Sequence, residues 1–198
     1  RLFEDLKQLN IDAFADLHDV IRSKAIRSLF ALSGKKVAYL DKDREEIKAL
    51  TRANNKIFKK LTTTVERHQK VFERLGFPID LSQPEFPEKA KIENPALHLM
   101  VKNAKKVIGI APFAQYETKV YPLDLMQEVI DTLAQHPEHA ILLFGGGKKE
   151  TAQLESLIGN KKNVFNMAGK IPFQDELNLI SNLDVMLSMD SGNAHIAA

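Results

Sequence analysis

The residues Asp190 to His195, with the sequence D-S-G-N-A-H, have the polar side chains and the backbone freedom that an anion-binding turn requires. They follow an apolar run at 185–189 with the length and composition of a buried parallel strand. Turn and N-cap residue types then lead into 194–198, which is predicted to begin a helix. In an open α/β sheet such a turn lies at the carboxyl edge, where ligands bind, and a helix start offers unpaired N–H groups to a phosphate. An ordinary helix cap explains the same residues equally well. The turn alone therefore does not distinguish an anion-binding site from a structural cap.

A lysine and a glycine run follow two other predicted strands. Lys119 lies in the loop after the strand at 107–111, where it could neutralise charge on a departing phosphate, although a single surface lysine is more often solvated. The glycines at 145–147 follow the strand at 140–144 and allow a tight turn under a ligand. Glu150 is then either a ligand of ribose hydroxyls or an ordinary helix N-terminal glutamate. The glycine run matches neither a Walker loop nor G-x-G-x-x-G.

Arginines follow the first predicted strand of the chain. Arg22 and Arg27 could bind an anionic acceptor, because a guanidinium binds phosphate bidentately. The D-K-D sequence at 41–43 matches the D-x-D pattern of metal-dependent sugar transferases, but a charged turn beside Arg44 is the simpler interpretation. Among the six histidines only His136 and His139 have H-x-x-H spacing, the H-E-x-x-H motif of zinc enzymes is absent, and no G-x-S-x-G elbow is present. Neither a metal nor a cofactor is predicted.

Composition narrows the functional classes. The chain has 198 residues, of which 44% are hydrophobic, as in an ordinary globular protein. With 28 basic and 26 acidic residues, the overall charge gives no case for nucleic-acid binding but leaves room for a local basic patch. The absence of cysteine fits a reducing compartment. No apolar run approaches the ~20 residues of a membrane-spanning helix.

The pattern of helices and strands predicts an α/β protein with two domains. In the first, residues 1–78, helix and strand signals alternate at 1–10, 11–17, 24–32, 35–40, 44–51 and 62–75. Residues 79–104 are rich in proline and are predicted to be an interdomain connection. In the second, residues 105–198, strands at 107–111, 140–144, 163–167 and 185–189 alternate with helices at 122–135, 148–158 and 172–180. Such alternation favours a doubly wound parallel sheet.

Both ends of the chain fall within predicted helices. Arg1 opens inside an amphipathic pattern without a preceding cap, and Ala198 stops one turn into a helix. The sequence is therefore expected to be part of a longer protein.

Taken in order, these segments resemble a known family. The succession IGIAPFAQYETKVYPLDLMQEVI, AILLFGGGKKE and AGKIPFQDELNLISNLDVMLSMDSGNAHIAA resembles the donor domain of glycosyltransferase family 9, the ADP-heptose:lipopolysaccharide heptosyltransferases. The first block, with IDAFADLHDVIRSKAIRSLF and TTVERHQKVFERLGF, looks like the later part of their acceptor domain. The resemblance implies a GT-B architecture of two Rossmann-like domains with parallel sheets, incomplete at both termini. It also implies metal-independent, inverting transfer of a sugar.

The resemblance assigns roles to individual residues. Lys119 and Asp190 take the catalytic positions beside the donor's diphosphate and sugar. Glu150 contacts the ribose and Ile171 packs on the base. The remaining donor-binding positions are Phe113, Ala114, Ser191, Gly192, Asn193 and His195, and Arg22 and Ser23 are acceptor candidates. Phe113 and Ala114 replace hydroxyl residues of better-known members, so backbone amides would have to take over their phosphate contacts.

Partners and location follow from the same resemblance. The donor would be an ADP-sugar, and the acceptor a lipid-linked phosphorylated glycan, at the cytoplasmic face of a bacterial inner membrane, with peripheral membrane contact and no nucleic acid. The family's general base is an aspartate at a position before Arg1, so this stretch by itself is expected to be inactive. Another GT-B nucleotide-sugar enzyme, or a non-catalytic nucleotide-sugar-binding fragment, stays open as an alternative. The sequence does not identify the sugar, the acceptor hydroxyl or the oligomeric state.

Overall fold

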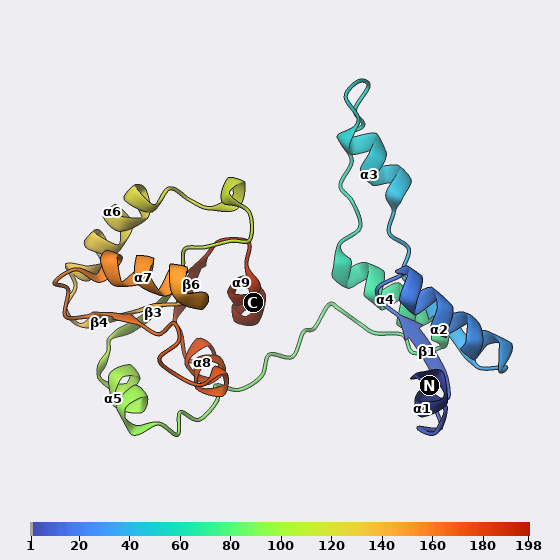
Figure 1. The fold of residues 1–198 in the computed structure, drawn as a ribbon, viewed down its shortest axis with the longest axis horizontal. Helices are drawn as coiled ribbons and strands as arrows, with labels where there is room; N and C mark the ends of the chain where they lie inside the picture. Colours follow the sequence, from blue (N-terminus) through green and yellow to red (C-terminus); the bar gives the residue numbers. More distant parts are fainter. Residues whose placement is uncertain (1) are drawn as a thin grey trace. The chain divides into compact units, whose positions relative to one another are not determined.

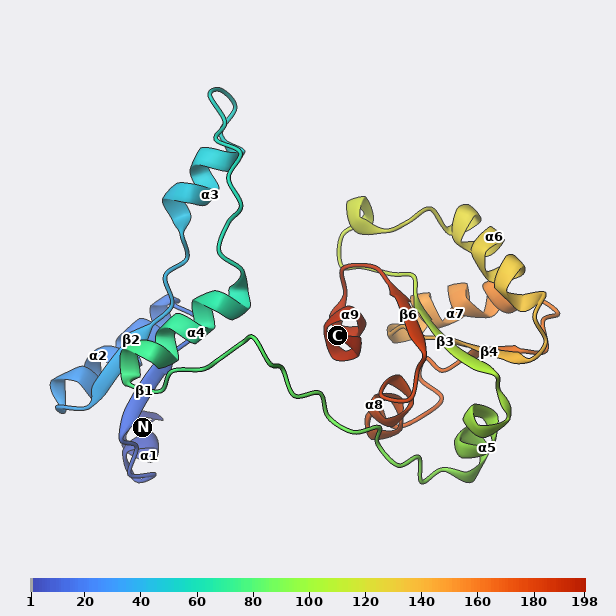
Figure 2. The same ribbon diagram turned by 180° about the vertical axis from the view of Figure 1, so that it is seen from behind.

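The computed structural model describes residues 2–198 and divides into two compact units, with the boundary between Glu85 and Phe86 (Figures 1 and 2). This boundary lies inside the stretch 79–104 that the sequence predicts to be a connection. Among the helices of residues 2–198, none has the length and apolar character needed to cross a bilayer.

The first unit contains a short parallel sheet flanked by helices. Its elements are α1 (Leu2–Lys7), β1 (Ala13–Asp16), α2 (Ile21–Leu32), β2 (Lys36–Tyr39), α3 (Arg44–Thr51) and α4 (Thr64–Leu75). Strands β1 and β2 pair in parallel around α2, which confirms the strand, helix and strand predicted at 11–17, 24–32 and 35–40. Helix α4 begins with a capping box between Thr63 and Glu66 and ends at Gly76, whose φ of 95° only glycine adopts without strain.

Two apolar clusters hold this unit together. Ala38 and Leu40 from the sheet pack against Val71 and Leu75 of α4. On α2, Phe30 is fully buried and contacts Phe14 of β1 with ring centroids 5.1 Å apart. Burying a side chain of that size contributes roughly 1.5–3 kcal/mol. The two helices are therefore attached to the strands by aromatic and aliphatic contacts.

The second unit is a doubly wound α/β domain. Its elements are α5 (Pro95–Asn103), β3 (Lys106–Ala111), the 3-10 helix η1 (Glu117–Lys119), α6 (Leu123–Ala134), β4 (His139–Leu143), α7 (Gly147–Ile158), β5 (Val164–Asn166), α8 (Phe173–Ile180), β6 (Val185–Ser188) and α9 (Gly192–Ala197). Its four strands are all parallel and run in the order β5-β4-β3-β6. The predicted alternation of strands and helices is confirmed.

Helix α5 is the main element that the sequence analysis did not anticipate. It lies in the stretch predicted to be a connection, yet its Leu97 is buried in the core of the second unit. The Asn94 side chain accepts hydrogen bonds from the first-turn N–H groups, and Pro95 occupies the first helical turn, where its missing N–H costs nothing. The prolines that suggest a linker therefore include a helix-start signal.

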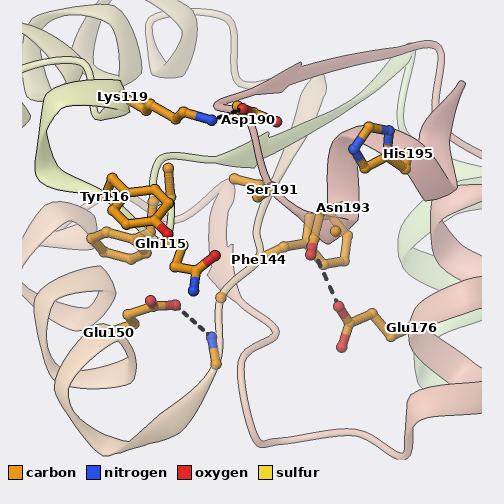
Figure 3. A pocket seen from close by; sticks show the side chains of 16 residues that line it. Gln115, Tyr116, Lys119, Phe144, Glu150, Glu176, Asp190, Ser191, Asn193 and His195 are labelled. Atoms are coloured by element: carbon orange, nitrogen blue, oxygen red, sulfur yellow. Dashed lines mark hydrogen bonds and ion pairs between the residues drawn. The ribbon is translucent and has the colours of Figure 1, made fainter. Parts of the chain in front are cut away.

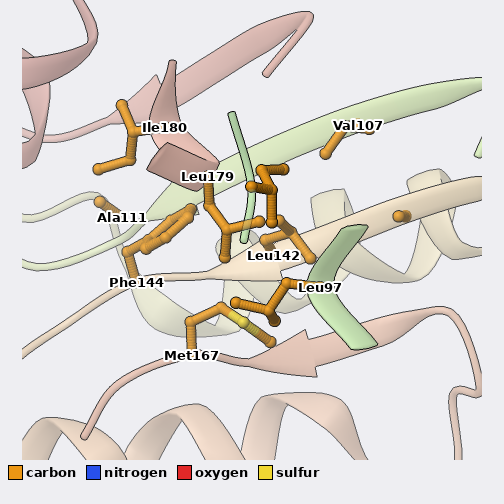
Figure 4. Packing of buried hydrophobic residues seen from close by; sticks show 10 residues of the cluster. Leu97, Val107, Ala111, Leu142, Phe144, Met167, Leu179 and Ile180 are labelled. Carbon is orange, nitrogen blue, oxygen red and sulfur yellow. The ribbon is translucent and has the colours of Figure 1, made fainter. Parts of the chain in front are cut away.

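Alternating residues of the strands face two helical layers. On one face Val107 and Ala111 join the cluster of Phe144 and Leu142, which α5 and α8 cover (Figure 4). On the other, Ile108 and Ile110 pack against α6 and α7. Figure 1 shows these two helix pairs on opposite sides of the sheet. Strands buried on both faces account for the continuous apolar runs in the sequence.

The order of strands creates a switch point beside β3. The chain moves from β3 outward to β4 and β5, then returns with β6 to the other side of β3. Gly109 lets β6 approach closely, because a Cβ at this position would lie 2.6 Å from the Sδ of Met186. Loops that leave the carboxyl ends of β3 and β6 diverge here, which is where open α/β sheets bind ligands.

Candidate functional site

A pocket of about 590 Å³ lies at this switch point (Figure 3). Its walls come from the loop after β3, from the glycine turn after β4 with the start of α7, from helix α8, and from the turn between β6 and α9 with the start of α9. Its lining residues are Ala111, Phe113, Ala114, Gln115, Tyr116, Lys119, Phe144, Gly145, Gly146, Glu150, Glu176, Asp190, Ser191, Gly192, Asn193 and His195. The volume is typical of small-molecule sites.

Lys119 and Asp190 form an ion pair at the rim of the pocket. Lys119 ends η1 in the β3 loop, and Asp190 follows β6, so the two neighbouring strands bring together residues that are 71 positions apart. Both side chains are about half exposed, at 48% and 56%. The hydrogen bond and charge of Lys119, and then the charge of His195, hold the pKa of the Asp190 carboxyl below its ordinary value. The lysine is thus held at the pocket rim with its charge facing a single carboxylate.

The turn that begins α9 lines the pocket through Ser191, Gly192 and Asn193. Ser191 is the N-cap residue, but its side chain makes no capping hydrogen bond and lies 3.2 Å from the Ser188 hydroxyl instead. The first-turn N–H groups of α9 therefore have no side-chain cap. At Gly192 a Cβ would meet no atom within 4 Å, so glycine here keeps one side of the turn open rather than relieving a clash.

Glu176 is a pocket residue that the sequence analysis missed. It comes from α8, and the Asn193 side chain donates a hydrogen bond to its Oε1 at 3.4 Å. Burial raises the pKa of the Glu176 carboxyl, and this hydrogen bond offsets only part of the effect. No sequence signal separates it from Asp175, the other acidic residue in the first turn of α8, and both suit any helix start.

Glu150 is fixed by the glycine turn that precedes it. Its Oε2 accepts a hydrogen bond from the Gly146 N–H at 2.7 Å. The turn is tight at Gly145, where a Cβ would lie 3.1 Å from that same oxygen and 3.3 Å from the Phe113 ring. Gly145 therefore lets a carboxylate and an aromatic ring meet at one edge of the pocket.

The loop after β3 adds an apolar and aromatic wall. Phe113 packs against the core cluster between the sheet and α6, while Gln115 and Tyr116, which the sequence analysis did not single out, line the pocket beside it. The Lys119 Nζ lies 5.8 Å from the centre of the Tyr116 ring, within reach of a cation–π contact. Phe144 is 1% exposed and joins the pocket to the core.

Most residues predicted for donor binding gather in this one pocket. In Figure 3, Glu150 and Glu176 lie on opposite sides of it, and Lys119 and Asp190 stand at its rim. Ile171 is not a lining residue, because its side chain packs against the α5–α8 core cluster. Its contact with a base stays a prediction.

The acceptor candidates belong to the first unit. Arg22 is exposed on α2, and the Ser23 hydroxyl donates to the Val20 carbonyl and accepts from the Val20 N–H, so this serine caps its own helix. Arg27, a further arginine considered for an acceptor, donates to Asp16 at 3.0 Å. Asp16 is buried, so this ion pair ties α2 to β1, and an acceptor contact by Arg27 stays a prediction.

The charge of the pocket limits what it can bind tightly. Three carboxylates, Asp190, Glu150 and Glu176, face one lysine, with His195 nearby. Across residues 2–198 no group of three side chains of the metal-binding types comes together. An anionic ligand must therefore rely on Lys119 and on backbone N–H groups, while the glutamates suit hydroxyl donors.

A doubly wound parallel sheet with a polar pocket at its switch point defines a Rossmann-like α/β domain. The model of glycosyltransferase family 9 (heptosyltransferase) matches residues 1–198, and the chain belongs to that family. No protein with a curated description matches the sequence.

Solved structures of glycosyltransferases share the fold. Heptosyltransferase WaaC of E. coli, solved with ADP, is 18% identical, with a TM-score of 0.64 over 94% of this chain and 58% of that one. A family 9 glycosyltransferase from Veillonella parvula is 16% identical, with a TM-score of 0.70 over 99% of this chain and 57% of that one. ADP-heptose lps heptosyltransferase II of E. coli is 16% identical, with a TM-score of 0.60 over 99% of this chain and 62% of that one.

These likenesses confirm the predicted fold class, which is α/β with the parallel sheets of the GT-B heptosyltransferases. The chain spans about three fifths of the length of each, as the 57–62% coverage shows.

Proposed function

We propose that the pocket of the second unit binds the ADP part of an ADP-heptose donor, and that the protein containing this chain transfers the sugar with inversion to a lipid-linked phosphorylated glycan at the cytoplasmic face of the inner membrane. Family membership supports a glycosyltransferase. Two of the similar structures, both of E. coli WaaC, are named as complexes with ADP and with ADP-2-deoxy-2-fluoro heptose.

The observation that carries the proposal is the position of Lys119. Among residues 2–198 it is the only lysine or arginine lining the pocket, and it stands beside the uncapped turn of α9. A diphosphate placed between them meets one full positive charge and several backbone N–H donors. Glu150 and Glu176 are then available to accept hydrogen bonds from ribose or sugar hydroxyls.

The same arrangement serves the transfer step. The acceptor oxygen attacks the anomeric carbon as the bond from that carbon to the diphosphate breaks, and the leaving ADP gains negative charge. Lys119 faces that charge and stabilises the transition state in which it develops. The acceptor's proton passes to a general base that lies outside this chain, as the family resemblance implies. No metal ion is needed for these roles.

Donor binding is tested by calorimetric titration of the chain with ADP, UDP and GDP. We expect ADP to bind at least tenfold more tightly than UDP or GDP, because the proposal assigns the pocket to an adenine nucleotide. Equal binding of all three would limit the proposal to an unspecific diphosphate site. Stronger binding of UDP or GDP would indicate another GT-B sugar transferase.

Transfer is tested on the complete gene product. Incubation with ADP-heptose and a lipopolysaccharide inner-core acceptor should release ADP and add one heptose, and nuclear magnetic resonance of the product should show the inverted anomeric configuration. Donor binding without any transfer would indicate a nucleotide-sugar-binding protein instead.

A further inference from the structure

The first unit carries a concentration of positive charge that the donor pocket does not explain. Residues 47–60, which we call the basic arm, contain five basic residues and no acidic ones. The rest of the chain holds the other 23 of the 28 basic residues and all 26 acidic residues. The basic arm is thus strongly cationic, while the remainder of the chain is slightly acidic.

The basic arm consists of the second half of helix α3, after Glu45 and Glu46, and the loop that follows. Figures 1 and 2 show α3 and this loop directed away from β1, α2 and α4. The loop is closed by a hydrogen bond from the Ile57 N–H to the Ala49 carbonyl at 2.9 Å. Every residue from 51 to 60 is exposed. The arm therefore presents its side chains outward.

Apolar side chains lie among these charges. Phe58 is 84% exposed and its neighbour Ile57 is 53% exposed. Lys59 pairs with Glu46, but Arg52, Lys56 and Lys60 form no ion pair within residues 2–198. Two adjacent exposed apolar side chains flanked by unpaired cations are the pattern of a segment that lies in the interface of a membrane.

We infer that the basic arm is a membrane-docking surface that places Phe58 and Ile57 into the headgroup region of a bilayer containing anionic lipids. Arg52, Lys56 and Lys60 face the negative surface potential, and each basic residue contributes about a fivefold gain in binding. Neither the charges nor two apolar side chains alone give stable attachment, whereas together they do. A single-stranded nucleic acid fits less well, because the Ile57 side chain offers no ring for a base to stack on.

Vesicle flotation tests this inference. The chain is mixed with vesicles of phosphatidylethanolamine and phosphatidylglycerol, or of phosphatidylcholine alone, at low and high salt. We expect binding to the anionic vesicles only, and weaker binding at high salt. The Phe58→Ser variant should reduce binding about tenfold through lost apolar burial, and Lys56→Gln with Lys60→Gln should reduce it roughly 25-fold.

Matched variants supply the controls. Phe86→Ser removes another exposed phenylalanine, and Lys7→Gln with Lys35→Gln removes the same charge from elsewhere on the first unit. Both should float like the wild-type chain. Equal binding to phosphatidylcholine, or basic-arm variants that float like the wild type, would overturn the inference. The inference would also be overturned if a single-stranded oligonucleotide bound as tightly as the anionic vesicles and bound the Phe58→Ser variant equally well.

ADP titration of the same variants separates this inference from the donor proposal. The basic arm supplies none of the pocket's lining residues, so its variants should bind ADP like the wild type. If the chain did not float with the vesicles, the donor proposal would still stand. If it did not bind ADP, the membrane-docking inference would still stand.

Discussion

Lys119 and Asp190 pair with each other at the rim of the pocket, although they come from loops that follow two different strands. The pair exists because β6 lies beside β3 with its carboxyl end at the same edge of the sheet. A diphosphate that binds to Lys119 must share it with Asp190 or replace that carboxylate. The pair therefore sets the strength of anion binding.

Replacing Lys119 by alanine should abolish most of the diphosphate binding and leave the fold intact. One charge-assisted hydrogen bond is worth roughly 1.5–3 kcal/mol, so the dissociation constant for ADP should rise about 10- to 150-fold. Because Lys119 is about half exposed, stability should change by less than about 0.5 kcal/mol. Calorimetry and thermal unfolding measure the two effects, with Lys102→Ala, an exposed lysine of α5, as control. Unchanged ADP affinity would remove Lys119 from the site.

Replacing Asp190 by asparagine should separate nucleotide affinity from turnover. The variant removes a negative charge near the diphosphate and frees Lys119, so we expect ADP to bind several-fold more tightly. Turnover of the complete protein should fall, because the family resemblance assigns Asp190 to a catalytic position beside the donor's diphosphate and sugar. Weaker ADP binding would show that Asp190 positions the lysine rather than competing for it.

A pair of adjacent glycines offers a test with an internal control. At Gly145 an added methyl group would be 3.1 Å from both Glu150 Oε2 and Leu154 Cδ1, whereas at Gly146 it would meet nothing within 4 Å. Gly145→Ala should therefore lower stability by about 1–3 kcal/mol and weaken ADP binding. Gly146→Ala, at φ −140°, should change stability by less than about 1 kcal/mol. Urea unfolding of both variants checks this, and equal effects would contradict the tight turn.

The sequence predicts the sheet well because its strands are buried on both faces. The runs that form β3 and β4 are continuous apolar segments bounded by charged residues, glycine or proline, and their carboxyl ends correctly predict which loops share a pocket. Lys119 and Glu150 come together for this reason. Helix α5 was not predicted, because Pro95 belongs to a proline-rich stretch that resembles a linker.

Residues that depend on helix packing could not be predicted. Glu176 enters the pocket because α8 covers the face of the sheet opposite α6 and α7, and a single sequence does not fix the rotation of α8. Ile171 shows the reverse, since an apolar residue at a loop end fits a base or a core equally well, and here it packs against the core. In the first unit, the bond from Arg27 to Asp16 spans 11 positions across a strand and a helix.

Glu176 should make the second unit less stable as the pH rises. Burial raises the pKa of this carboxyl above its ordinary value of 4.5, so the folded unit binds the proton more tightly than the unfolded chain does. Between pH 4.5 and the folded pKa, each increase in pH therefore lowers stability, and above the folded pKa the loss is complete. Glu176→Gln removes the titration and should be more stable at pH 7 by less than about 1 kcal/mol, since the group is only partly buried.

The difference between wild type and Glu176→Gln should vanish well below pH 4.5, where the carboxyl is protonated in both the folded and the unfolded states. Hydrogen exchange of the β3 and β4 amides measures the stability of the second unit without interference from the first. The exposed Glu128→Gln on α6 is the matched control for the loss of one carboxylate from the second unit. A Glu176→Gln variant that is less stable than wild type at pH 7 would mean that the hydrogen bond from Asn193 outweighs the cost of burying the charge.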